Sequence, residues 1–210
     1  MNTKVSHTLS HGNGPKIVLA CPECRHKGVF EIIGTDIYDQ VNKTWLGQRR
    51  CPNDNCFTHI FYILNNSTNK LYSYPQTTIE FNREGIPEKI LAAFEEAVKC
   101  HSIGCHIASA IMIRKTLEEI SNKEGTTGKN LKEKLKGLGN KITIPKELMD
   151  GMDDLRLLGN DAAHVEANTF EQIGNQEIEI SIEFTKEILK ATYQYEGLLN
   201  KLRSLRKNAE

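Results

Sequence analysis

The sequence predicts an α+β protein in which a β domain precedes an all-α helical bundle. Two close cysteine pairs lie in the N-terminal third, each in a turn between strand-like segments. From Ile86 onward, apolar residues recur roughly every three to four positions rather than every second position, which favours helices. We expect a flexible polar tail over residues 1–15, the β domain over residues 16–82 and the helical bundle over residues 83–210.

The composition excludes a generally basic nucleic-acid-binding surface. Charged residues make up 26% of the 210 residues, and 27 Lys and Arg balance 27 Asp and Glu, so nucleic-acid binding requires a local patch. The chain begins without an apolar leader, and no run approaches the length of about 20 apolar residues that crosses a membrane. We therefore expect a cytoplasmic protein with no membrane partner. In that compartment, six cysteines indicate metal ligands and free thiols rather than disulfides.

Four of the cysteines form the most specific motif of the chain. Cys21 and Cys24 form a C-x2-C pair, and Cys51 and Cys56 form a C-x4-C pair. A tetrahedral thiolate site requires two tight turns that face each other, and the metal replaces the core that a short hairpin cannot supply. The motif predicts a zinc ribbon over residues 16–82 with one structural zinc ion. Because four thiolates leave no position for water, we expect this zinc to stabilise and not to catalyse.

Other residues near the cysteines leave two alternatives open. His26 and His59 lie close enough in the sequence to serve as substitute ligands. Arg49 and Arg50 precede the second cysteine pair, and a basic group beside aromatic rings could contact a nucleic-acid backbone and stack a base. The aromatic residues concerned are Trp45, Phe57 and Phe61. We favour the alternative that these aromatic side chains fill the small core of the ribbon.

Apolar periodicity predicts four to five helices in the second domain. They cover residues 86–102, 103–125, 131–138, 149–165 and 177–205, with a connector near Asn168. In the second helix we expect an inward-facing set consisting of Ile107, Ile111, Leu117 and Ile120. At the junction of the first two helices lies a cluster consisting of Cys100, His101, Cys105 and His106. Steps of five residues separate side chains around a helix, so we interpret this cluster as buried thiols in a tight turn and not as a second metal site.

The helix over Met149–Val165 carries the candidate catalytic residues. Arg156, Asn160 and His164 follow one another at intervals of four, so they form one stripe on a helix. A permanent cation, an amide and an imidazole that titrates near neutrality together suit phosphate chemistry. The alternative is that the three side chains are polar caps and buried hydrogen-bond partners.

The segments EEAVKCHSIGCHIASAIMIRKTLEEI and LRLLGNDAAH resemble the helical family DUF4145, and the upstream CPEC and CPNDNC motifs resemble the zinc-binding preface of many members. Such domains occur attached to restriction and phage-defence proteins and are similar to HEPN domains. The resemblance therefore implies a HEPN-like helical bundle in a nucleic-acid-associated protein of bacterial phage defence or restriction. Many HEPN proteins are dimeric, metal-independent ribonucleases with an Arg-x4-6-His motif. Here seven residues separate Arg156 from His164.

This spacing makes a catalytic centre dependent on a homodimer. Along one helix the eight-residue step is about 12 Å, too far for both groups to serve one phosphate. An antiparallel partner helix would bring each Arg156 towards the other His164, with Gly159 and Ala163 permitting close approach. In that dimer His164 would act as general acid or base on a ribose 2′-hydroxyl, Arg156 would stabilise the phosphorane and Asn160 would orient the phosphate. The alternative is a non-catalytic dimerisation or adaptor module whose ribbon and bundle bind RNA, DNA or a protein partner of a defence system.

Overall fold

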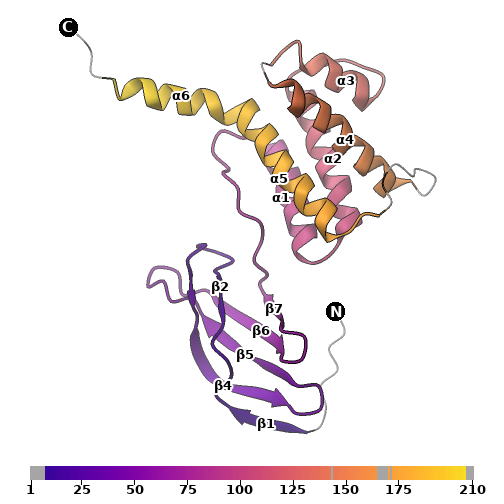
Figure 1. Cartoon of the computed structure of the whole chain (residues 1–210). Coiled ribbons are helices and arrows are strands. Elements are labelled where there is room, and N and C mark those ends of the chain that lie inside the picture. Colours follow the sequence, from indigo (N-terminus) through magenta and orange to yellow (C-terminus); the bar gives the residue numbers. More distant parts are fainter. Residues whose placement is uncertain (1–7, 143, 165–169, 171, 207–210) are drawn as a thin grey trace. The chain divides into compact units, whose positions relative to one another are not determined.

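The protein folds as an α+β chain with a β-sheet unit followed by an all-helical unit (Figure 1). The computed structural model describes residues 8–142, 144–164, 170 and 172–206. The first compact unit ends at Thr78 and the second begins at Ile79, slightly before the expected boundary at residue 82. The start of the expected tail, Val165 and the connector near Asn168 lie outside the described residues.

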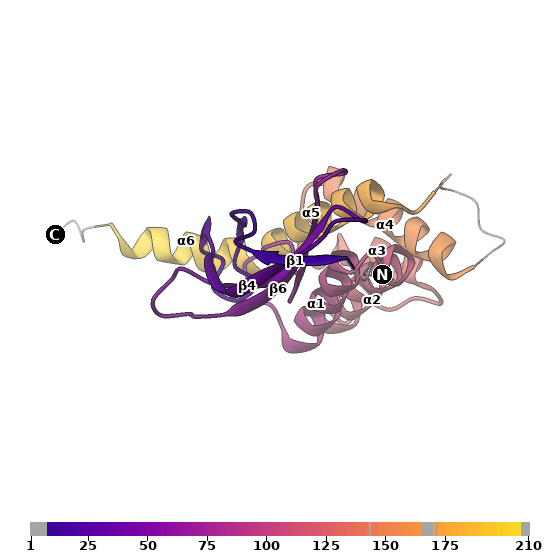
Figure 2. The same ribbon diagram turned by 90° about the horizontal axis from the view of Figure 1, so that it is seen from below.

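The first unit is built on a five-stranded antiparallel sheet in the order β1-β4-β5-β6-β7, and β2 and β3 form a separate hairpin (Figures 1 and 2). The strands are β1 Leu9–Gly12, β2 Val18–Ala20, β3 Lys27–Val29, β4 Glu31–Asp39, β5 Thr44–Arg50, β6 His59–Asn65 and β7 Lys70–Tyr74. The prediction of a flexible tail is wrong for Leu9–Gly12, which pair with β4. The pairing satisfies backbone groups along the free edge of β4, and this interaction requires no apolar pattern in the added strand.

The core of the β unit lies on one face of the sheet only. Alternation along each strand sends Ile60 and Tyr62 of β6 to that face, where they pack with the segment around Ile17 and Phe30. Among the described residues, the buried apolar members of this core are Ile17, Cys21, Phe30, Cys51, Ile60 and Tyr62. Two of these six residues are cysteines, so the core includes the candidate metal ligands.

The second unit contains helices close to those expected from the apolar period. They are α1 Glu88–Ser102, α2 His106–Lys123, α3 Leu131–Leu138, α4 Lys146–Ala163, α5 Asn175–Leu189, the π-helical turn η1 Lys190–Gln194, and α6 Tyr195–Ser204. The last three elements follow one another without a break. Among the described residues, no helix combines the length and apolar character needed to cross a membrane.

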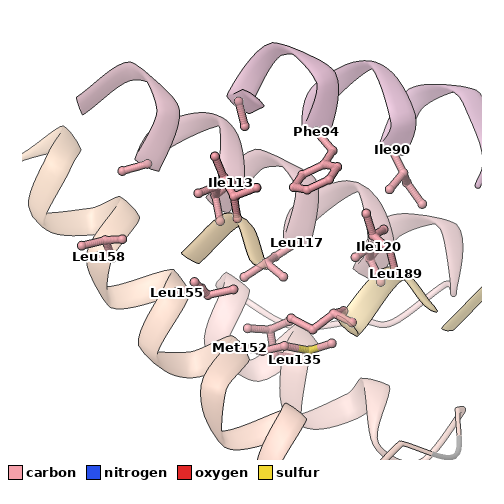
Figure 3. Packing of buried hydrophobic residues seen from close by; sticks show 14 of the residues in the cluster. Ile90, Phe94, Ile113, Leu117, Ile120, Leu135, Met152, Leu155, Leu158 and Leu189 are labelled. Atoms are coloured by element: carbon pink, nitrogen blue, oxygen red, sulfur yellow. The ribbon is translucent and has the colours of Figure 1, made fainter. Parts of the chain in front are cut away.

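The core of the helical unit gathers apolar residues from α1 to α5, including Leu189 at the end of α5 (Figure 3). On α2, Leu117 and Ile120 are buried as predicted, but Ile107 and Ile111 are exposed. The inward position near the start of α2 belongs to Ala110, which is fully buried. Because α1 and α4 both pack on this part of α2, a small residue occupies the contact and the larger isoleucines turn outward.

Candidate metal centre and candidate active site

The four predicted cysteine ligands come together in the β unit. The Sγ atoms of Cys21, Cys24, Cys51 and Cys56 all lie within 4.8 Å of one another. The Sγ–Sγ distance is 3.8 Å between Cys21 and Cys56 and 3.6 Å between Cys24 and Cys51. A tetrahedron with metal–sulfur bonds of about 2.3 Å has edges of about 3.8 Å. These residues therefore fit one tetrahedrally coordinated metal ion.

Two similar backbone turns hold the cysteines in place. In the first, the Cys21 N–H donates to the His26 carbonyl at 2.9 Å, and in the second the Cys51 N–H donates to the Thr58 carbonyl at 2.9 Å. The residue after the last cysteine of each pair has a positive φ, 63° at Arg25 and 53° at Phe57, which closes the turn around the sulfurs. Among the described residues His26 and His59 do not join the cluster, so the alternative of histidine ligands is wrong.

The thiols of the second turn differ in acidity. A hydrogen bond with the Thr58 hydroxyl, 3.0 Å from the Cys56 sulfur, is the main reason that the pKa of Cys56 falls to about 6. Burial raises the pKa of Cys51 to about 12. Cys56 is therefore ready to bind as a thiolate near neutral pH, whereas Cys51 needs the charge of a metal ion to ionise.

Arg49 stabilises the inside of the β unit and does not form part of a nucleic-acid patch. Its guanidinium donates to both carboxylate oxygens of Asp36, at 2.7 and 2.8 Å, and both side chains are fully buried. The Tyr62 hydroxyl lies 3.1 Å from Arg49 Nη2, and the Gly14 N–H donates to Asp36 at 2.7 Å. The less favoured alternative, in which Arg49 contacts nucleic acid, is wrong, because its position on β5 faces the covered side of the sheet.

The aromatic residues near the metal centre do not all fill the core. Trp45 packs against the buried cluster, with its ring 4.7 Å from that of Tyr38. Phe57 and Phe61 are instead exposed, so the core-filling interpretation is wrong for these two rings. The Arg50 guanidinium lies over the Phe57 ring, 5.4 Å from its centroid.

The face of the sheet opposite the core carries further aromatic residues, and we call it the open face. Strand register places Phe61 beside Tyr74 and Ile63 beside Tyr72. The cross-strand partners of these residues on β5 and β4 are the polar and aliphatic side chains Gln48 and Leu46 on β5 and Ile33 and Ile37 on β4. The open face comprises Ile33, Ile37, Leu46, Gln48, Phe61, Ile63, Tyr72 and Tyr74. A shallow pocket of about 470 Å³ lies over its β4–β6 part.

The polar stripe predicted on α4 is interrupted in the structure. The helix ends at Ala163, and His164 has extended backbone angles of φ −132° and ψ 120° and an exposed side chain. Asn160 accepts a hydrogen bond from Arg114 of α2. Arg156 is only 11% exposed and donates from Nε to Asp153 at 2.6 Å. Arg156 and Asn160 thus have partners within the chain, and His164 lies beyond the helix that was expected to align it with them.

Gly159 permits close helix packing inside the chain. A Cβ atom at this position would lie 2.5 Å from the Cβ atom of Arg114 and 3.2 Å from the Ala110 carbonyl oxygen, so α2 occupies the space beside it. The expectation that Gly159 provides the contact to a partner helix is therefore wrong. The sequence shows that the position demands a small residue, but it does not show which helix approaches.

The cluster at the α1–α2 junction does not form a metal site among the described residues. The ring centroids of His101 and His106 are 6.0 Å apart. The expectation of buried thiols is wrong for Cys105, which is exposed, while Cys100 is half-buried. Burial raises the pKa of the Cys100 thiol, which favours its protonated form.

Sequence reasoning missed two residues that organise the β unit, Asp36 and Tyr62. A signal for both was present. Residues paired across neighbouring strands point to the same face, and Arg49 on β5 pairs with the buried Ile60 on β6. Arg49 is therefore expected to be buried, and a buried cation requires a carboxylate partner such as Asp36.

Comparison with known proteins concerns mainly the helical unit. No curated protein and no solved structure matches the chain. The family model described as "Domain of unknown function (DUF4145)" matches residues 95–208, which is more than half of the chain and includes α2 to α6. The cysteine cluster lies before the matched region and is consistent with the zinc ribbon expected there. The chain belongs to the DUF4145 family.

Proposed function

We propose that this protein is a nucleic-acid-associated binding module that holds single-stranded nucleic acid on the open face of a zinc-stabilised sheet. The observation that carries the proposal is the exposed pair of rings formed by Phe61 and Tyr74, which are 56% and 74% exposed on neighbouring strands. Exposed aromatic side chains are costly in water and seldom gather on one sheet face without a binding role.

Zinc is the metal that best suits the cysteine cluster. Four thiolates at tetrahedral spacing, with no additional ligand among the described residues, form the set that structural zinc sites use. Cys21, Cys24, Cys51 and Cys56 would hold the ion and fix the two turns at one end of the sheet. The bound ion supplies structural rigidity, which keeps β5 and β6, and therefore the open face, in register.

The geometry of the open face suits stacking of bases. Phe61 and Tyr74 are direct cross-strand neighbours, and Tyr72 stands two residues from Tyr74 on the same side of β7. Successive bases of a single strand can stack on such rings, and each stacked base contributes about 1–3 kcal/mol without sequence preference. Aliphatic side chains of the same rows, Ile33 and Ile63, extend the apolar surface.

Basic groups lie at the margins of the open face. Arg50 and Lys70 occupy the two ends of its rows, at opposite ends of β5 and β7. Arg50 donates to Glu31 at 2.9 Å and is therefore partly neutralised. We expect only a few phosphate contacts, and hence binding that depends on stacking more than on charge. With about two or three such contacts, log K would fall with log salt with a slope of about −2.

Oligonucleotide binding tests this proposal. Labelled oligothymidine and oligouridine are titrated with the full chain, and fluorescence anisotropy gives Kd. Phe61→Ala and Tyr74→Ala are each expected to raise Kd about tenfold, because each removes one stacking platform. The matched control is Leu71→Ala, which removes a partly exposed apolar side chain from the other face of β7. Absence of binding by the wild type, or an equal loss in the control, would refute the proposal.

A metal-independent ribonuclease is the second candidate function, and the exposure of His164 favours it. The expected result is cleavage of single-stranded RNA without added divalent ions, with a loss of about a hundredfold or more in His164→Ala, the range that general acid–base catalysis contributes. Equal background cleavage by wild type and variant would remove this candidate. The phage-defence setting stays a prediction of the family resemblance.

A further inference from the structure

Helix α6 carries an apolar stripe that no other helix of its unit covers. None of its residues is buried, and among the helices of the second unit it contacts only the adjoining η1. Figures 1 and 2 show α6 continuing beyond the bundle formed by α1 to α5. The π turn at Lys190–Gln194 adds a residue to the helical path, so the apolar stripe of α6 is offset from the buried face of α5. Leu205, at the end of α6, is 78% exposed.

The stripe has the spacing of a helix-pairing seam and is symmetric about Asn200. Tyr195, Leu198, Leu202 and Leu205 alternate steps of three and four, which corresponds to the a and d positions of a heptad. Leu198 and Leu202 lie two residues on either side of Asn200, and Tyr195 and Leu205 lie five residues on either side. A seam of this kind is complementary to itself when two copies run antiparallel.

A pocket at the start of α6 provides the matching cavity. It has a volume of about 340 Å³, and Tyr195, Gly197 and Leu198 line it together with the segment around Glu84 and Gly85. The Gln194 side chain fixes that segment by donating to the Asn82 and Glu84 carbonyls at 2.9 and 3.1 Å, and Lys201 binds the Glu84 carboxylate at 2.7 Å. The cavity is therefore built from well-anchored walls.

An apolar knob, Leu205, caps the C-terminal end of the helix that lines this cavity. Leu205 stands ten residues, or about 15 Å along the helix, from Tyr195. When a two-fold axis lies midway between the knob and the cavity, near Asn200, the knob of each copy can enter the cavity of the other copy.

We propose that two copies of the chain associate through antiparallel packing of α6, with Leu205 of the partner subunit entering the pocket beside Tyr195 and Leu198. This interface goes beyond the proposed nucleic-acid binding and uses a different unit. The charge pattern supports the same orientation. Glu196 lies in the first turn of α6, the basic residues Lys201 and Arg203 lie in its last turn, and Arg206 follows two residues after its end. In an antiparallel pair of α6 helices, the acidic start of one helix lies beside the basic end of the other. In a parallel pair, like charges would lie beside each other.

Measurement of mass in solution tests this interface. Sedimentation equilibrium of the full chain over a wide concentration range is expected to give a dimer of twice the 23.7 kDa chain mass. The double variant Leu202→Glu/Leu205→Glu is expected to raise the dimer Kd about ten-thousandfold, from about tenfold for each of the four leucine contacts that the two copies lose. At protein concentrations far below the dimer Kd of the wild type, its thermal melting should match that of the wild type, because neither leucine is buried in the single chain and dimerisation then adds no stability.

The matched control is Ile180→Glu, which introduces the same charge at an exposed apolar position of α5. This variant is expected to dimerise as the wild type does. A single-chain mass for the wild type at every concentration would overturn the proposal, and so would a dimer that the double variant leaves intact. Loss of the dimer in Ile180→Glu would also overturn it, since the interface would then lie on α5.

Discussion

The Cys24→Ser variant is expected to lose its bound metal and to unfold in the β unit while the helical unit stays folded. The Cys24 side chain is exposed, so the substitution removes a ligand without opening a cavity. Among the described residues, the apolar core of the β unit has six buried members, two of which are ligands, so we expect this small core to need the ion to hold the sheet. Structural zinc sites contribute on the order of 10 kcal/mol to folding, so the loss of one thiolate has a large effect.

Two optical signals separate the units in this experiment. Trp45 is the only tryptophan and lies in the β unit, so its fluorescence follows the sheet. Far-UV circular dichroism at the helix minimum follows the second unit. Elemental analysis is expected to find one zinc per chain in the wild type and much less in Cys24→Ser. The control Cys105→Ser changes an exposed thiol outside the cluster and should keep both zinc and Trp45 fluorescence. A folded, metal-free wild-type sheet would contradict the assignment.

The Arg49→Met variant is expected to destabilise the β unit by about 3–5 kcal/mol. Methionine keeps most of the side-chain volume but leaves the fully buried Asp36 carboxylate without its cation. The cost arises from that uncompensated charge, which the Gly14 N–H and the Tyr62 hydroxyl cannot neutralise. Urea unfolding followed by Trp45 fluorescence measures the change in the free energy of unfolding.

The double variant Arg49→Met/Asp36→Leu distinguishes lost charge pairing from lost packing. Replacing both members of a buried ion pair by apolar groups is often nearly neutral, so we expect much of the stability to return. A double variant as unstable as Arg49→Met would show that packing around the pair, and not its charge, is the main contribution. Gly47 approaches Asp36 closely, since a Cβ atom at Gly47 would lie 1.7 Å from Asp36 Oδ1. The side chain that replaces Asp36 therefore has little room on the side of Gly47.

The same pair makes stability depend on pH in a defined direction. Burial alone would raise the pKa of Asp36, but hydrogen bonds from Arg49 and Gly14 and the charge of Arg49 outweigh it, so the pKa lies below its usual value. A folded-state pKa below the unfolded value of about 3.9 means that the contribution is present above that pH and is lost as pH falls through the folded pKa. The difference in unfolding free energy between wild type and Arg49→Met should therefore shrink in acid.

The metal centre could be predicted from the sequence because its chemistry is local. Cys21 and Cys24 fall in one turn and Cys51 and Cys56 in another, and each turn is fixed by a few adjacent backbone hydrogen bonds. Two such cysteine pairs commonly bind one structural zinc ion, so the site could be predicted without knowing which distant residues pack around it. The helices were equally accessible, since the apolar period that predicts them is also what buries Leu117 and Ile120.

The fate of individual polar residues was decided by tertiary structure. The sequence shows that Arg49 and Asn160 are polar, but only the arrival of Asp36 from β4 and of Arg114 from α2 decides that both are internal partners. The same holds for Phe61, whose exposure depends on which face of the sheet the other segments cover. Local patterns fix periodicity and short-range ligand geometry, whereas the choice of neighbours across the sheet and between helices is set by packing of residues distant in the sequence.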